Sequence, residues 1–112
     1  MGVPFTSILD TLVATHQPAV RAAIFCDHEG EKVASSNGAL LPFDVDVVGA
    51  SLALAANRMH AGSRARVIAG DLVVWMLVVD LGCYLVVWCT PGQDLRCRGA
   101  FPAVAQALLA EM

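Results

Sequence analysis

Apolar side chains near the start of the chain recur at the spacing of one face of an α-helix. They stand at positions i, i+3, i+4, i+7 and i+8, and are Phe5, Ile8, Leu9, Leu12 and Val13. Ser7 and Asp10 have the spacing of a capping box, and Pro18 cannot continue a helix because its ring clashes with the preceding turn. The pattern therefore predicts a helix over residues 6–17.

Short runs rich in β-branched and aromatic residues predict five strands. The first two form a hairpin, with Gly30 in the turn where a positive φ is wanted, and residues 36–38 close this unit. The three later runs are joined by turns too short for a crossover, so they are antiparallel. The last two are apolar at both odd and even positions, so helices must cover both faces of the sheet. The expected strands are residues 21–26, 31–35, 64–69, 72–79 and 83–90.

The segment between the two groups of strands predicts a helix over residues 42–60 that is apolar nearly all round. One stripe consists of Val45, Val48, Leu52, Ala55 and Met59, and another of Val47, Ala50, Leu54 and Ala61. Asp44 or Asp46 suits its first turn, and beyond that turn Arg58 is the only charged residue. A second helix could approach closely along the small residues Gly49, Ala50, Ala53 and Ala56. We expect another chain to supply part of the cover that this helix needs.

The C-terminal segment predicts a last helix over residues 93–112, in which Pro102 either kinks the helix or marks its true start. Its core stripe is Phe101, Val104, Ala105, Leu108 and Leu109. The polar second strand and the charged third strand suit the edges of the sheet, which leaves the apolar fifth strand beside the first. We therefore expect an α/β fold, a three-layer sandwich of topology αββαβββα with strand order 2-1-5-4-3, in a single domain over residues 1–112.

Composition and charge narrow the possible partners. Apolar residues make up 57% of the chain, charged residues 15%, and the net charge is −3 without a basic stripe, so nucleic-acid binding is not expected. No apolar run reaches the roughly 18–20 residues of a membrane span. The first residues show no secretory signal pattern, and the four cysteines form no CxxC pair. We expect a cytoplasmic protein with buried, reduced thiols and no membrane insertion.

A search for catalytic and ligand-binding motifs finds none with adequate spacing. There is no phosphate loop, no dinucleotide-binding glycine motif, no GxSxG and no HExxH. The turn residues Asp27, His28 and Glu29 could touch a metal, and Cys89 and Cys97 with His16 could be proposed for zinc, but no paired ligand spacing supports either site. His60 suits a helix end rather than a metal. We expect no catalytic residue, no cofactor and no metal, and therefore not an enzyme.

Arginines and tryptophans are open to two interpretations each. As arginine fingers, the arginines would stabilise charge in phosphoryl transfer, whereas as ordinary residues they are solvated charges at sheet edges and helix ends. These arginines are Arg58, Arg64, Arg66, Arg96 and Arg98. We favour the solvated interpretation, and we expect Trp75 and Trp88 to lie in the core rather than to bind a ligand.

The order and spacing of these elements resemble those of the Roadblock (dynein light-chain) family, and within it the small bacterial stand-alone members of the MglB type. The resemblance covers the whole chain. It rests on the hairpin 23–34, the Ala-rich middle helix and the three-strand meander that ends at residues 82–88. The most specific piece is the Asp27-x-x-Gly30 turn followed by Val33-Ala34. The chain departs from the family pattern at Pro102 and in having a single lysine.

This resemblance implies a homodimer and a protein partner. In the family, third strands pair across a two-fold axis and the middle helices pack together, and the dimer is a non-catalytic platform for a small Ras-like GTPase. Members of the MglB type act as GTPase-activating proteins by reshaping the switch regions of the GTPase without inserting an arginine. The alternative is a dimeric scaffold or ligand-sensing module without a GTPase partner.

Two sets of site residues follow from these expectations. The expected dimer interface comprises Val47, Ala50, Leu54, Arg64, Arg66 and Ile68. The expected partner-binding surface comprises Asn57, Arg58, His60, Arg64 and Arg66. The second set is the only polar and basic cluster beside the proposed dimer axis, and the switch regions of Ras-like proteins are commonly acidic.

Overall fold

A computed structural model of the chain describes residues 4–37, 41, 43–55, 62–79 and 82–112, without the side chains of residues 50 and 53–55. The elements in chain order are α1 (Pro4–Thr15), β1 (Val20–Cys26), β2 (Lys32–Asn37), α2 (Val45–Ala55), β3 (Arg64–Ala69), β4 (Leu72–Val78), β5 (Tyr84–Cys89), α3 (Asp94–Cys97) and α4 (Ala100–Ala110). No helix in these ranges is both long and apolar enough to cross a membrane.

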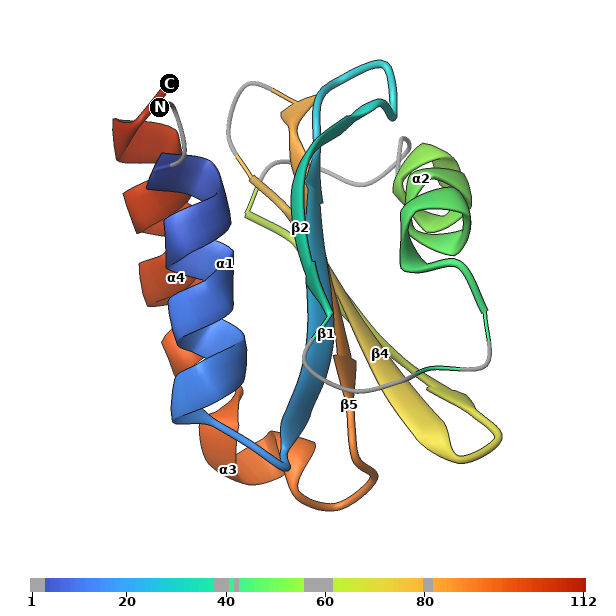
Figure 1. Cartoon of the computed structure of the whole chain (residues 1–112). Helices are drawn as coiled ribbons and strands as arrows, with labels where there is room; N and C mark the ends of the chain where they lie inside the picture. The colour runs from blue at the N-terminus through green and yellow to red at the C-terminus, as the bar shows by residue number, and fades with distance from the viewer. Residues whose placement is uncertain (1–3, 38–40, 42, 56–61, 80–81) are drawn as a thin grey trace.

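The five strands form one antiparallel sheet in the order β2-β1-β5-β4-β3, as the polarity of the edge strands predicts. The α1 and α4 helices lie side by side against one face of the sheet, and α2 covers the other face (Figure 1). The predicted α/β fold class and the three layers are therefore confirmed.

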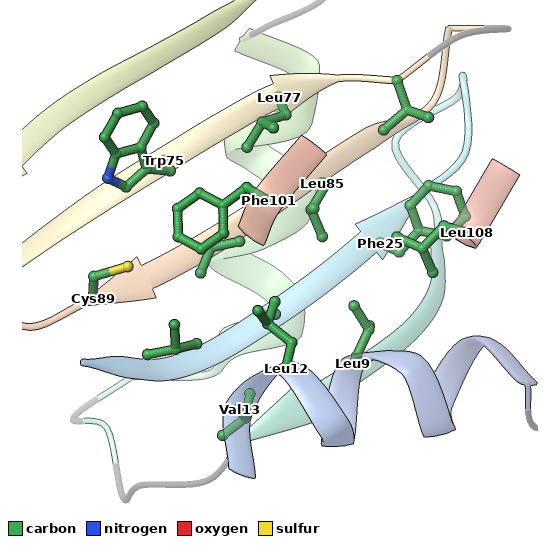
Figure 2. Packing of buried hydrophobic residues seen from close by; sticks show 14 of the residues in the cluster. Leu9, Leu12, Val13, Phe25, Trp75, Leu77, Leu85, Cys89, Phe101 and Leu108 are labelled. Carbon is green, nitrogen blue, oxygen red and sulfur yellow. The ribbon is translucent and has the colours of Figure 1, made fainter. Parts of the chain in front are cut away.

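The core between the sheet and the α1/α4 layer is built from large side chains on all three elements. Leu9 and Leu12 of α1 point toward the strands (Figure 2), and they belong to the same buried cluster as Phe101 and Leu108 of α4. Trp75 of β4 packs edge-on against Phe101, with ring centroids 5.8 Å apart. Each of these five side chains is buried, and together they pack α4 against the sheet.

The core on the other side of the sheet is smaller and depends on close approach of α2. Phe43, just before the helix, packs on Trp88 with ring centroids 5.9 Å apart. A Cβ atom added to Gly49 would collide with the side chain of Ile24 on β1. The expectation that Gly49 serves contact with another helix is therefore wrong, because its missing side chain is what lets α2 sit close to its own sheet. Trp75 and Trp88 are both core residues, as expected.

Several predicted boundaries differ from the structure. Because α1 already begins at Pro4, Ser7 and Asp10 lie within the helix, and the capping box predicted for them is wrong. The β2 strand runs through Ser36 to Asn37 instead of closing at residue 35, since these residues still pair with β1. The α2 helix begins at Val45 instead of residue 42, since Phe43 and Asp44 are described and are not helical, and the predicted end at residue 60 lies outside the described residues.

The starts of α2 and α4 suit two different residue types. The Asp44 carboxylate accepts a hydrogen bond from the backbone N–H of Asp46 at 2.9 Å, which confirms Asp44 as the cap of α2. At the C-terminus, the predicted single helix is divided into α3 and α4, and Pro102 lies in the first turn of α4. A proline is tolerated there because the first backbone N–H groups of a helix have no partner within it. Pro102 therefore marks a helix start and makes no kink.

Candidate interaction surfaces on the two sides of β3

The β3 strand forms one edge of the sheet, and most of its side chains are open to solvent. Val67 is 44% exposed and Ile68 is 67% exposed, although both are large and apolar. An edge strand also presents a row of unpaired backbone N–H and C=O groups. Among the described elements, β3 packs extensively only against β4. This edge therefore offers both apolar side chains and free backbone groups to another chain.

Side chains of β3 alternate between the two faces of the sheet, and the pairing with β4 settles which face each one takes. Arg66 lies opposite Trp75, whose side chain belongs to the core on the α4 side. Val67 lies opposite Val74, which belongs to the core on the α2 side. By the same alternation, Arg64 and Ile68 share the α4 side with Arg66.

On the α2 side, an apolar groove of about 210 Å³ runs between α2 and the β3–β4 hairpin. Phe43 and Leu52 line one wall, and Val67, Val74 and Met76 line the other. Val47 of α2 is a further exposed apolar residue, at 62%. No described helix or strand covers the groove, which is lined in part by Val67 and Ala69 of the β3 edge.

On the α4 side, a buried carboxylate holds β3 to the C-terminal segment. Asp94 at the start of α3 is fully buried and accepts hydrogen bonds from Arg66 Nε at 2.6 Å and Arg66 Nη2 at 3.2 Å. The indole Nε1 of Trp75 donates a third bond to Asp94 at 2.9 Å. This bidentate pair ties the edge strand to α3 across 28 residues of sequence.

The protonation states around Asp94 follow from these contacts. The guanidinium of Arg66, together with the Trp75 N–H, holds the pKa of Asp94 below its ordinary value despite burial. Burial raises the pKa of the nearby thiols of Cys89 and Cys97, and it raises the pKa of Cys26 to about 11. All four cysteines are free and buried, as expected, and a protonated thiol is neither a nucleophile nor a metal ligand.

The predicted interface and partner-binding residues divide into three groups. Val47 and Ile68 are exposed, as an interface requires. Asn57, Arg58 and His60, and the side chains of Ala50 and Leu54, lie outside the described residues. Arg64 and Arg66 are described, and their place corrects one expectation. They point to the α4 side of the sheet, so they do not adjoin the outer surface of α2 on the opposite side.

Arg64 and Arg66 also differ from each other. Arg66 is committed to Asp94, so its guanidinium is not free for a partner. Arg64 is exposed and its guanidinium lies over the ring of Trp75, 5.9 Å from the ring centre. Sequence reasoning missed Asp94, and the only signal for it is that no other acid occurs between Asp80 and Glu111.

The turn at residues 27–30 is stabilised by the side chain of its first residue, Asp27. One carboxylate oxygen of Asp27 accepts hydrogen bonds from the backbone N–H groups of Glu29 at 2.9 Å and Glu31 at 3.0 Å. Gly30 takes a φ of 83°, as the sequence predicts for this position. No group of three His, Cys, Asp or Glu side chains within the described ranges is arranged to hold a metal ion.

Solved structures share this architecture, although sequence comparison finds no relative: no protein-family model and no curated protein matches the chain. MglB of Myxococcus xanthus is 15% identical, with a TM-score of 0.73 over 97% of this chain and 94% of that one. The gliding protein MglB of Thermus thermophilus is 17% identical, with a TM-score of 0.70 over 99% and 92%. A Roadblock/LC7 domain of Streptomyces avermitilis is 21% identical, with a TM-score of 0.66 over 100% and 99%. The chain therefore has a Roadblock-family fold of the MglB type.

Proposed function

We propose that this chain is a non-catalytic, homodimeric regulatory module that binds a small Ras-like GTPase. The observation that best supports the dimer is the exposed apolar edge of β3 beside the uncovered groove at α2. The fold shared with MglB structures, and the family resemblance of the sequence, support the regulatory role and the class of partner.

A second copy of the chain fits the β3 edge because a two-fold axis lets the same surface serve both partners. Antiparallel pairing of two β3 strands would satisfy the free backbone groups and extend the sheet. The same axis would bring the two α2 helices together, covering Val47 and closing the groove beside Val67. One similar structure is of MglB in a tetrameric arrangement, at 18% identity and a TM-score of 0.69, so self-association occurs in a protein of this fold.

Binding by shape suits a chain without phosphate-binding motifs. Such a platform would contact the mobile loops of the GTPase and shift their population toward one conformation. Residues 57, 58 and 60 come after the described part of α2 in the sequence. We keep them as the proposed contact with the GTPase. Arg64 lies on the other face of the sheet and has no acidic partner among the described residues, and it would contribute where the GTPase extends around the β3 edge to the α4 side.

The experiment mixes the purified chain with Ras-like GTPases encoded in the same genome, each loaded with GDP or a GTP analogue. Calorimetry measures binding, and phosphate release measures hydrolysis. We expect no GTP hydrolysis by the chain alone and nucleotide-dependent binding of one GTPase. Arg58→Ala and Arg64→Ala should each weaken binding up to about tenfold without dissociating the dimer, because each removes one peripheral contact.

Matched variants make the outcome decisive. Arg98→Ala, at another exposed arginine, should leave binding unchanged. A loss of about a thousandfold in stimulated hydrolysis from Arg58→Ala or Arg64→Ala would contradict the platform and indicate an arginine finger. An unchanged affinity in both variants would contradict the proposed contact surface. If no GTPase binds in either nucleotide state, the regulatory proposal fails and the scaffold or ligand-sensing alternative replaces it.

One observation favours that alternative independently of any GTPase. A cleft with the exposed Arg64 side chain at its wall lies between α4 and the β3–β4 hairpin, on the side of the sheet away from α2. We further propose a cytoplasmic location, which the four free, buried cysteines support.

A further inference from the structure

We propose that the cleft between α4 and the β3–β4 hairpin binds a small amphipathic carboxylate, a ligand with an unbranched apolar body and one anionic end. The site lies on the opposite face of the sheet from the groove at α2. It is therefore separate from the surface assigned to the α2 contact of the dimer. The inference does not depend on the proposed GTPase partner.

The cleft has the size and the lining of a small-molecule site. Its volume is about 610 Å³, within the range of roughly 300–1,000 Å³ typical of ligand pockets. Apolar side chains form most of its lining, and they are Leu77, Val79, Pro102, Ala105 and Leu109. Among the described residues, the polar side chains of the lining are those of Ser63, Arg64 and Gln106.

Packing of the helices explains why the cleft is open here. The α1 and α4 helices contact each other, and α1 packs on β1 and β2, at the opposite edge of the sheet from β3. Within the described part of the chain, β3 packs extensively only on β4, so no described helix packs extensively on β3 on this side. Small side chains at Ala105 and Pro102 leave the space between α4 and the hairpin unfilled.

Arg64 supplies the anion-binding group. Its guanidinium is exposed and held over the ring of Trp75, and Trp75 is itself fixed by Asp94 and Phe101. No carboxylate within the described ranges lies at ion-pair distance from Arg64, whereas neighbouring Arg66 is already paired with Asp94. A guanidinium that lies over an aromatic ring and has no acidic partner among the described residues can bind a ligand carboxylate with two parallel hydrogen bonds.

The scarcity of polar groups favours a small ligand over a peptide. A peptide would bring a backbone N–H and C=O with every residue, and these groups would lose water against the apolar wall. Among the described residues that line the cleft, Ser63, Arg64 and Gln106 are the ones whose polar side chains could compensate for that loss. A straight-chain carboxylate brings a single polar end and buries methylene groups against Leu77 and Leu109, so its chemistry matches the lining.

The experiment titrates the full chain with decanoate, below the concentration at which decanoate forms micelles, and with decanol as the uncharged counterpart. Calorimetry gives the affinities, and amide chemical shifts locate the ligand. We expect the wild type to bind decanoate at least about tenfold more tightly than decanol, since only the carboxylate can pair with Arg64. The shifts should gather on Ser63, Leu77, Ala105 and Gln106.

Variants separate the charge from the cleft. Arg64→Gln should weaken decanoate binding about tenfold or more and leave decanol binding unchanged, while Arg64→Lys should keep part of the preference. Arg98→Gln, at an exposed arginine outside the cleft lining, should change neither affinity. Ala105→Phe should fill the cleft and abolish binding of both ligands. Unfolding curves of each variant verify that the fold is retained.

Four results would overturn the proposal. The first is a wild type that does not bind decanoate, and the second is equal affinity for decanoate and decanol. The third is a set of shifts centred on Phe43, Leu52 and Val67, which would place the alkyl chain in the groove at α2. The fourth is binding of an acidic peptide that depends on Arg64 while decanoate fails to compete, which would make the cleft a peptide site.

Discussion

The two edge strands of the sheet, β2 and β3, differ in their polarity and in how far helices pack against them. The β2 edge is polar in sequence yet covered, because α1 packs against it and Lys32 pairs with Asp46 of α2 at 2.8 Å. The β3 edge carries the large apolar residues Val67 and Ile68, yet no helix of the described chain covers it. A protein that left an apolar edge open would risk unspecific strand pairing.

The difference between the β2 and β3 edges indicates where another molecule would bind. The β2 strand contacts α1 and α2 of the same chain, and Val33 is its one large exposed apolar residue, so this edge offers a partner less apolar surface than β3 does. The apolar edge lies between a groove on the α2 side and a cleft on the α4 side, and both hollows border the same strand. We therefore propose that the interaction surfaces of this molecule are concentrated around β3.

The largest effect should come from breaking the apolar edge itself. Val67→Lys would place a charge in the proposed pairing of two β3 strands, and the two-fold axis would bring in its symmetric copy. We expect the dimer dissociation constant to rise by about 100-fold or more, which corresponds to roughly 2.7 kcal/mol. Sedimentation equilibrium over a range of concentrations measures this constant.

The other edge provides the matched control for this variant. Val33 on β2 is 40% exposed, close to the 44% of Val67, and both are valines on edge strands. Val33→Lys should leave the dimer unchanged. If both substitutions raised the dimer dissociation constant equally, the claim that the dimer forms through β3 and not through β2 would be contradicted.

The next effect concerns the tether that holds β3 to α3. Asp94→Ala would leave the guanidinium of Arg66 and the indole N–H of Trp75 without their shared acceptor. We expect the free energy of unfolding to fall by about 3 kcal/mol, as measured by denaturant titration. Asp71→Ala, at an exposed residue of the β3–β4 turn, should change it by no more than about 0.5 kcal/mol.

The same tether predicts a pH dependence whose sign follows from the pKa of Asp94. Arg66 holds this pKa below the ordinary 3.8, so the ion pair stabilises the fold fully above that value. Its contribution is lost as the pH falls through the folded-state pKa. The stability difference between the wild type and Asp94→Asn should be constant near neutral pH and should shrink at pH values below about 4. A difference that grows on acidification would contradict an ionised Asp94.

The smallest effect should come from the tether of the polar edge. Both side chains of the Lys32–Asp46 pair are exposed by more than 40%, so water and salt screen their attraction. Lys32→Ala should lower the free energy of unfolding by less than about 1 kcal/mol, and the difference should vanish at high salt. A loss as large as that of Asp94→Ala would mean that the two edges depend equally on their tethers.

The strand order could be predicted from the sequence because edge strands carry their own signature. Polar residues of β2 and the arginines of β3 placed these strands at the edges, and the apolar β5 then had to lie in the centre. The stripe Val45, Val48 and Leu52 likewise identified the face of α2 that packs on the sheet. These features depend on local polarity, which the sequence displays directly.

Features that depend on tertiary contacts could not be predicted. The face to which Arg64 and Arg66 point is set by the pairing of β3 with β4 and by which helices cover each face. The role of Asp94 depends on Arg66, which is 28 residues away, and on Trp75. Gly49 looked like a contact for another helix because the sequence does not show how near α2 lies to Ile24.

Hydrogen exchange of the β3 backbone amides, followed as a function of protein concentration, tests the central claim most directly. An edge strand of a monomer exposes alternate amides to water, whereas a β3 strand paired with a second copy protects them. We predict a particle of twice 11.8 kDa at micromolar concentration, in which protection along residues 64–69 falls on dilution and is absent in Val67→Lys. A dimer of that mass with unprotected β3 amides, or a monomer at every concentration, would contradict the account.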